Sequence, residues 1–153
     1  MISLLTLQKG SLVNQFRPCV MHRIVWERYI VAGSPTTPRE ILAQLASDVS
    51  VRVRKHVAEN LNTPIGTLVS MALDDDAEVR STVADNPNTP LPVLELLSED
   101  EHNDVRFGLA ENPKTPIHIL RTLGRDDNPY VACRARKTLE TMCRAGLELA
   151  ACA

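Results

Sequence analysis

The feature that most constrains the fold is a phrase of seven residues that returns every 26 residues, four times in all. Its copies are AGSPTTP at 32–38, AENLNTP at 58–64, ADNPNTP at 84–90 and AENPKTP at 110–116. A fixed period of about 20–50 residues is the signature of stacked repeats, in which one small unit is copied along the chain. We therefore expect a repeat architecture rather than a single irregular core.

Other columns of the sequence keep the same step, without an insertion between residues 32 and 135. The matching positions are Leu42, Leu68, Leu94 and Leu120; Leu45, Met71, Leu97 and Leu123; Asp48, Asp74, Asp100 and Asp126; and Val53, Val79, Val105 and Val131. This register divides the stretch into four repeats, at 32–57, 58–83, 84–109 and 110–135.

Each repeat predicts two short helices. The Thr of the Thr-Pro pair is expected to cap the first helix by accepting a backbone N–H, with Pro at the first helical position. Apolar residues four and seven places after the Pro then share one face, which predicts a first helix over about residues 38–47. Asp48 is expected to cap a second helix over about residues 49–59, with Val53 and Val57 facing inward.

The repeated phrase predicts the end of the second helix. A residue that precedes Pro is pushed out of the helical region, and Asn side chains bond backbone groups in turns. The Asn residues that recur at this place are Asn60, Asn86 and Asn112. Because they are stacked at a fixed step, we expect them to form a ladder along the molecule.

Neither helix of a repeat can bury its apolar face alone, so the repeats must stack and the end units must cap the core. The sequence therefore predicts a single all-α domain over 1–153, an α-solenoid of four two-helix repeats. Residues 1–31 form the expected N-terminal cap, where Trp26 and Tyr29 are expected to cover the end of the core. Residues 136–153 form the expected end of a C-terminal capping helix and its tail.

These residues resemble two related repeat families. The pattern Asp74, Val79, Arg80 resembles the inter-helix signature of HEAT repeats. The short unit, with NPNTP leading into a Leu-rich helix, is more similar to the leucine-rich repeat variant family of the armadillo-like group, over about residues 24–139. The resemblance implies a right-handed superhelix and leaves open whether one class of helix is 3₁₀. One member of that family holds an iron–sulfur cluster in a Cys-rich N-terminal segment. This segment has only Cys19 here, so no cofactor is expected.

Composition and motifs narrow the functional classes. A formal net charge of -2 and an aromatic content of 3% do not favour nucleic acid, because phosphate binding needs clustered cations and base stacking needs rings. The sequence has no P-loop, G-x-S-x-G, H-E-x-x-H or C-x-x-C motif, so neither catalysis nor a metal site is expected. It shows no signal peptide and no apolar run of membrane-spanning length, which predicts a cytoplasmic protein that does not enter a membrane.

The Arg residues that follow the Val column raise a choice between two roles. Arg54, Arg80 and Arg106 share the step, whereas the fourth copy has Ala132. A row of Arg can bind phosphates, but each of these residues follows an Asp by six positions. We therefore expect the Arg and Asp columns to pair with each other, within or between repeats.

A candidate binding surface lies on the outward stripe of the second helix, at positions 52, 55, 56 and 59 and their copies. The partner-binding candidates are Arg52, Lys55, Glu78, Asp85, Asp104, Phe107, Glu111 and Tyr130. The two middle copies supply four acidic residues and no basic one, and Phe107 is a large apolar residue among Lys, Ser and Cys.

This stripe predicts a non-catalytic protein-interaction module or scaffold, which binds a basic or amphipathic protein segment on its concave face. The alternative for the stripe itself is a mixed-charge surface that only keeps the solenoid in solution. The alternative function is a HEAT-type solenoid that binds nucleic acid, as in DNA repair. The oligomeric state stays open.

Overall fold

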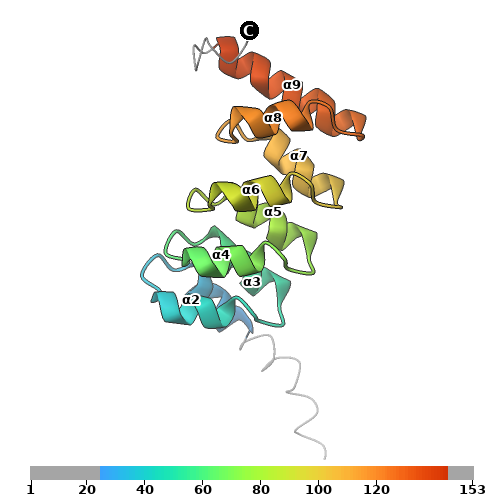
Figure 1. The fold of residues 1–153 in the computed structure, drawn as a ribbon. Coiled ribbons are helices and arrows are strands. Elements are labelled where there is room, and N and C mark those ends of the chain that lie inside the picture. Colours follow the sequence, from blue (N-terminus) through green and yellow to red (C-terminus); the bar gives the residue numbers. More distant parts are fainter. Residues whose placement is uncertain (1–24, 145–153) are drawn as a thin grey trace, which may run out of the picture.

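The computed structural model describes residues 25–144, and all regular structure in this part of the chain is helical (Figure 1). A helical segment over residues 25–33 comes first. The helices that follow are α2 (Arg39–Leu45), α3 (Val51–Glu59), α4 (Ile65–Met71), α5 (Ala77–Asp85), α6 (Leu91–Leu97), α7 (Asn103–Glu111), α8 (Ile117–Leu123) and α9 (Pro129–Arg144). The all-helical prediction is confirmed, and these helices are α-helical rather than 3₁₀. The predictions for residues 1–24 and 145–153 lie outside the described residues.

The helices alternate between two roles. Figure 1 shows them stacked along one direction, with α2 near one end and α9 at the other. The second helices of successive repeats, α3, α5, α7 and α9, pack directly against one another. Each first helix packs against the second helix that follows it. This arrangement is a helical-repeat stack, while the handedness and the exact number of repeats stay predictions.

One continuous apolar core runs through the stack. Its fully buried side chains come mainly from the predicted columns, among them Leu42, Leu68, Val53, Val79 and Val105. Two predicted core residues, Leu45 and Leu94, are only half-buried. In α6 the adjacent Val93 is buried instead, at 5% exposure, so this helix presents a slightly different edge to the core.

The Thr-Pro pair does not work as predicted. The first helices begin one residue after Pro, and Pro64 itself is the N-cap with ψ of 144°. The Thr63 hydroxyl instead donates to the Val57 carbonyl at 2.5 Å, and the Thr89 hydroxyl donates to the Val83 carbonyl at the same distance. The last carbonyls of a helix lack their usual partners four residues on. The Val57 carbonyl accepts the Asn60 backbone N–H at 3.2 Å, and the Thr63 hydroxyl adds a second hydrogen bond. Thr therefore closes the preceding second helix rather than opening the next first helix.

The Asp column does not provide the predicted N-caps of the second helices, because these N-caps lie two residues further along the chain. The N-caps of α3, α5 and α7 are Ser50, Asp76 and His102. Asp48 accepts a hydrogen bond from the Ser50 backbone N–H at 2.8 Å, and the other copies repeat this contact. Each Asp therefore shapes the turn before the second helix, as Asp side chains do in short loops.

The Arg and Asp columns pair across the seams between repeats, in a row that we call the Arg–Asp ladder. Its ion pairs are Arg28–Asp48, Arg54–Asp74, Arg80–Asp100 and Arg106–Asp126. In the Arg80 rung, Nε and Nη2 lie 2.7 Å and 2.9 Å from the two Asp100 carboxylate oxygens, while Nη1 donates to the Asp74 carbonyl at 2.7 Å. The predicted pairing is confirmed, with each Arg bound to the Asp of the following repeat. One guanidinium thus joins two successive turns.

A second row, the Asn ladder, joins the opposite turns. Asn60 donates to the Ala32 carbonyl at 2.7 Å, and Asn86 donates to the Ala58 carbonyl at 2.6 Å. This confirms the predicted ladder for these two residues. Asn112 departs from it, since its amide lies 3.2 Å from an Asp85 carboxylate oxygen.

The Asn column ends with a different residue. Thr138 lies 26 residues after Asn112, and its hydroxyl donates to the Ala110 carbonyl at 2.7 Å. The last helix therefore closes the ladder with a hydroxyl in place of an amide.

Candidate functional site

The predicted binding stripe lies on the solvent-facing side of residues 25–33, α3, α5, α7 and α9, which we call the B-face. Six of the eight candidate residues are exposed there, namely Arg52, Glu78, Asp85, Asp104, Glu111 and Tyr130. Lys55 and Phe107 are half-buried. The B-face carries two neighbouring hollows, and Lys55 lines both.

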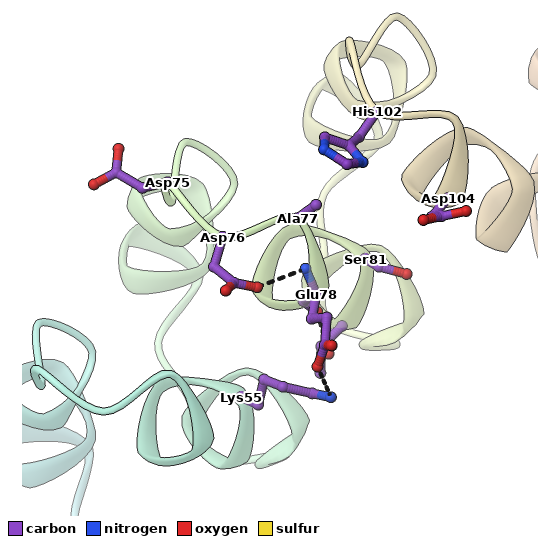
Figure 2. Close-up of a pocket in the computed structure, with 9 residues that line it drawn as sticks. Lys55, Asp75, Asp76, Ala77, Glu78, Ser81, His102 and Asp104 are labelled. Atoms are coloured by element: carbon purple, nitrogen blue, oxygen red, sulfur yellow. Dashed lines mark hydrogen bonds and ion pairs between the residues drawn. The ribbon is translucent and has the colours of Figure 1, made fainter.

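The first hollow, of about 560 Å³, is acidic (Figure 2). Three of the candidates, Lys55, Glu78 and Asp104, line it together with Asp75 and Asp76. The Lys55 ammonium lies 2.8 Å from a Glu78 carboxylate oxygen, and this hydrogen bond raises the pKa of Lys55 against the opposing effect of burial. The surplus of carboxylates over the single Lys leaves the hollow suited to cationic groups.

The turns between the helices supply much of this acidity. Asp76 is the N-cap of α5 and accepts the Glu78 backbone N–H at 2.8 Å, which Figure 2 shows as a dashed line. Asp75 lies beside it in the same turn, and His102 lines the hollow from the next turn. Because Asp74 fixes this turn through its hydrogen bond to the Asp76 N–H at 2.9 Å, the fold itself positions the carboxylates.

The second hollow, of about 320 Å³, is aromatic. The Trp26 ring stacks on the Tyr29 ring, with the ring centroids 5.2 Å apart. The Tyr29 ring contacts the His56 ring at a tilt, with the ring centroids 3.9 Å apart. Arg52 and Glu59 complete its charged rim. Tyr29 packs against the core, as predicted, whereas Trp26 is 59% exposed and stacks on Tyr29.

A glycine makes room for this aromatic stack. A Cβ placed on Gly33 would lie 2.7 Å from His56 Nδ1, closer than real Cβ contacts. The missing side chain lets the His56 ring lie against residues 25–33, where it meets Tyr29. The aromatic hollow therefore depends on Gly33 as well as on its rings.

The other candidates lie outside both hollows. Phe107 is half-buried and packs against the core, so it offers only part of its ring to a partner. Asp85 accepts from Asn112; burial raises the pKa of the Asp85 carboxyl, and that hydrogen bond opposes the shift. Glu111 lies 3.4 Å from the Arg134 guanidinium. Tyr130 is 77% exposed at the start of α9.

Sequence reasoning missed the acidic and aromatic residues that the turns and residues 25–33 bring to the hollows. Asp75, Asp76 and His102 lie in turns, outside the helical stripe that defined the search, and Trp26 and Tyr29 were assigned to the core. The run of three Asp at 74–76 and the scarcity of aromatic residues were the available signals.

The described residues contain neither a cluster of metal ligands nor a membrane-spanning helix. Within residues 25–144, no three His, Cys, Asp or Glu side chains are placed to hold a metal ion together. None of the helices described is both long and apolar enough to cross a membrane. The B-face offers carboxylates, aromatic rings and a few cations on its helices and turns.

Comparison with known proteins gives a family match within the repeats. The model of the leucine rich repeat variant family matches residues 77–102, which confirms the predicted resemblance for the stretch from α5 to the turn after α6. This family is a helical-repeat type that usually serves in protein-interaction scaffolds and is typically non-catalytic. Searches of the curated proteins and of the solved structures returned no match.

Proposed function

We propose that this chain is a non-catalytic protein-interaction module that holds a basic segment of a partner protein on the B-face. The observation that carries the proposal is the pair of adjoining hollows, one acidic and one aromatic, with Lys55 between them. Carboxylates attract Lys and Arg side chains, and exposed rings bind both apolar groups and cations. An extended segment that crosses both hollows would meet each of these contacts in turn.

The distribution of charge supports a basic partner over nucleic acid. Residues 72–105 contain ten acidic residues and a single Arg, although the whole chain has a net charge of only -2. A central field of this sign repels phosphates and draws cationic segments towards the middle of the molecule. The alternative of a nucleic-acid-binding solenoid gains no support from this surface.

The packing of the helices supports a concave B-face. The second helices pack directly on one another, whereas the first helices pack mainly on second helices. In a curved stack the more tightly spaced side is the inner one. We propose a right-handed solenoid of four repeats with the B-face on its inner side, and a location in the cytoplasm.

Binding to pools of labelled peptides tests this function. The probes are two random peptide pools, one enriched in Lys and Arg and one enriched in Asp and Glu, measured by fluorescence anisotropy. We expect the basic pool to bind and the double variant Glu78→Lys/Asp104→Lys to lose that binding. The matched control is Glu40→Lys/Glu140→Lys, which makes the same change of charge at exposed sites outside both hollows.

Equal loss of binding in both double variants would show only a general charge effect and would contradict the proposal. A gel shift of duplex or single-stranded DNA, or of RNA, at low salt would contradict it in favour of the nucleic-acid alternative.

A further inference from the structure

A third hollow lies away from the helical stripe of the B-face, between the C-terminal end of α4 and α6. It has a volume of about 360 Å³, and we call it the seam hollow. The side chains of Leu73 and Leu96 line it and are 71% and 50% exposed. Two large apolar side chains thus face solvent within one concave site.

The other repeats show that the fold does not need leucines here. At the place of Leu73 the other copies have Ser47, Glu99 and Arg125. At the place of Leu96 they have Gln44, Ser70 and Thr122. Every one of these equivalents is polar, so the stack forms without an apolar residue at either place. The two leucines are therefore a local specialisation of the middle seam.

The rim of the seam hollow is acidic and uncompensated. Asp75, Glu99 and Glu101 are exposed, and among the described residues none of them forms an ion pair or a side-chain hydrogen bond. Arg80 is the cation that lines the hollow, but it is bound to Asp100 on one side and to the Asp74 carbonyl on the other. The hollow therefore presents three free carboxylates around an apolar floor.

These features select the occupant. The described carboxylates are not grouped to hold a metal ion. An anionic or purely apolar ligand would leave the rim desolvated without a partner, at a cost in affinity. A peptide segment with an apolar side chain between Lys or Arg residues would satisfy both the floor and the rim.

We infer that the seam hollow is a docking site for a short basic segment of a partner protein, anchored by one apolar side chain on Leu73 and Leu96. This contact does not rest on the proposed function of the B-face, since its apolar floor of Leu73 and Leu96 belongs to the seam hollow and not to the acidic hollow. Asp75 lines both this hollow and the acidic hollow. One long partner segment can therefore pass from one to the other.

The test uses a labelled peptide that has one leucine between two pairs of lysines, with anisotropy as the measurement. The variant is Leu73→Ser/Leu96→Ser, because other repeats have Ser47 and Ser70 at these places and still stack. The matched control is Leu61→Ser, an exposed leucine in the turn between α3 and α4. Circular dichroism verifies that each variant keeps its helical content.

We expect the double variant to weaken binding by about tenfold or more, because it removes most of the apolar area that the anchor covers. The Leu61→Ser control should bind as the parent chain does. A peptide with serine in place of its leucine should bind the parent weakly and should not distinguish it from the double variant.

Three outcomes would overturn the inference. One is unchanged binding in the double variant. Another is loss of binding in Glu78→Lys/Asp104→Lys with no effect of the leucine changes, which would place the peptide on the B-face and leave the proposed function standing. The third is concentration-dependent self-association by sedimentation velocity that the double variant abolishes, which would make a second copy of the chain the occupant.

Discussion

The seams between repeats and the outer surface of the same repeats follow opposite rules. At the seams, one kind of contact recurs: an Arg Nε lies 2.7 Å from an Asp oxygen in the rungs of Arg54, Arg80 and Arg106 alike. At the surface, one column reads Ser47, Leu73, Glu99 and Arg125, with a different character in each repeat. Stacking requires the same contact at each seam, whereas an outer position that faces solvent can hold residues of any character. Constant columns therefore carry the fold, and variable columns are where binding can evolve.

The largest expected effect comes from breaking the seam in its middle. The variant Arg80→Met leaves the Asp100 carboxylate, 7% exposed, without its ion pair and the Asp74 carbonyl without its donor. Removing one partner of a buried, hydrogen-bonded ion pair costs about 3–5 kcal/mol. We expect a loss of this order in the free energy of unfolding, measured by urea denaturation followed by circular dichroism.

The end of the same ladder supplies the control for Arg80. Arg28 pairs with Asp48, but its side chain is 30% exposed and it ties down only the first described helical segment. In a stack, stability adds up from neighbouring units, so losing an end contact frays one unit rather than dividing the molecule. Arg28→Met should therefore cost clearly less than Arg80→Met. Equal losses would show that the ladder is not the element that joins the repeats.

The Asn ladder allows a comparison between Asn86, which bonds a backbone carbonyl of the preceding repeat, and Asn112, which does not follow this pattern. Asn86 is 5% exposed and donates to the Ala58 carbonyl, so Asn86→Ala leaves a buried acceptor unsatisfied, at about 1–3 kcal/mol. Asn112 is half-buried and donates to the exposed Asp85 instead. We expect Asn112→Ala to lower the melting temperature by less than half as much. A larger effect at Asn112 would mean that its amide also holds the turn between repeats.

Acid should destabilise the fold through the carboxylates of the seams. Burial by itself raises the pKa of Asp74 and Asp100, but the hydrogen bonds from Arg54 and Arg80 and from backbone amides outweigh it and hold each pKa below the usual 3.8. For Asp126 the hydrogen bond from Arg106 is the largest cause, and its pKa is lowered too. A carboxyl with a lowered folded pKa stabilises the fold above its unfolded pKa and loses that contribution as pH falls through the folded value.

The expected result is a melting temperature that is level near neutral pH and falls below about pH 4. Asp85 works in the opposite direction, since burial raises its pKa, and protonation in this range favours the folded state. In Arg80→Met the Asp100 carboxyl has lost the group that lowers its pKa, so the acid fall should be shallower. Parallel melting profiles for the parent and Arg80→Met would contradict this assignment.

The sequence predicts the helices well because their signals are local and are repeated. The predicted first helix at about 38–47 and second helix at about 49–59 compare with α2 at Arg39–Leu45 and α3 at Val51–Glu59. The predicted N-cap role of Thr was wrong because its hydroxyl bonds instead to a carbonyl near the end of the preceding helix. Thr63 lies where its hydroxyl reaches Val57, and that partner is visible only once the turn is folded.

The site was harder to predict because its parts come from turns and from contacts between repeats. A helical stripe finds Lys55, Glu78 and Asp104, which do line one hollow. It does not find Asp75, whose direction depends on the turn that Asp74 shapes. Nor does it find Trp26, which lines a hollow through its stack on Tyr29.

The smallest effect on stability is expected where the effect on binding matters most. Asp104 is exposed, and within the described chain it forms no ion pair or side-chain hydrogen bond, so Asp104→Ser should change the unfolding free energy by no more than about 0.5 kcal/mol. The same change removes one carboxylate from the acidic hollow and should weaken binding of the basic peptide pool a few-fold, more at low salt than at high salt. Asn86→Ala should do the reverse, with a lower melting temperature and unchanged affinity at a temperature where both proteins are folded. If Asp104→Ser destabilises the chain as much as Asn86→Ala does, this surface position contributes to the stability of the fold. The distinction between constant columns that carry the fold and variable columns that bind partners would then be wrong.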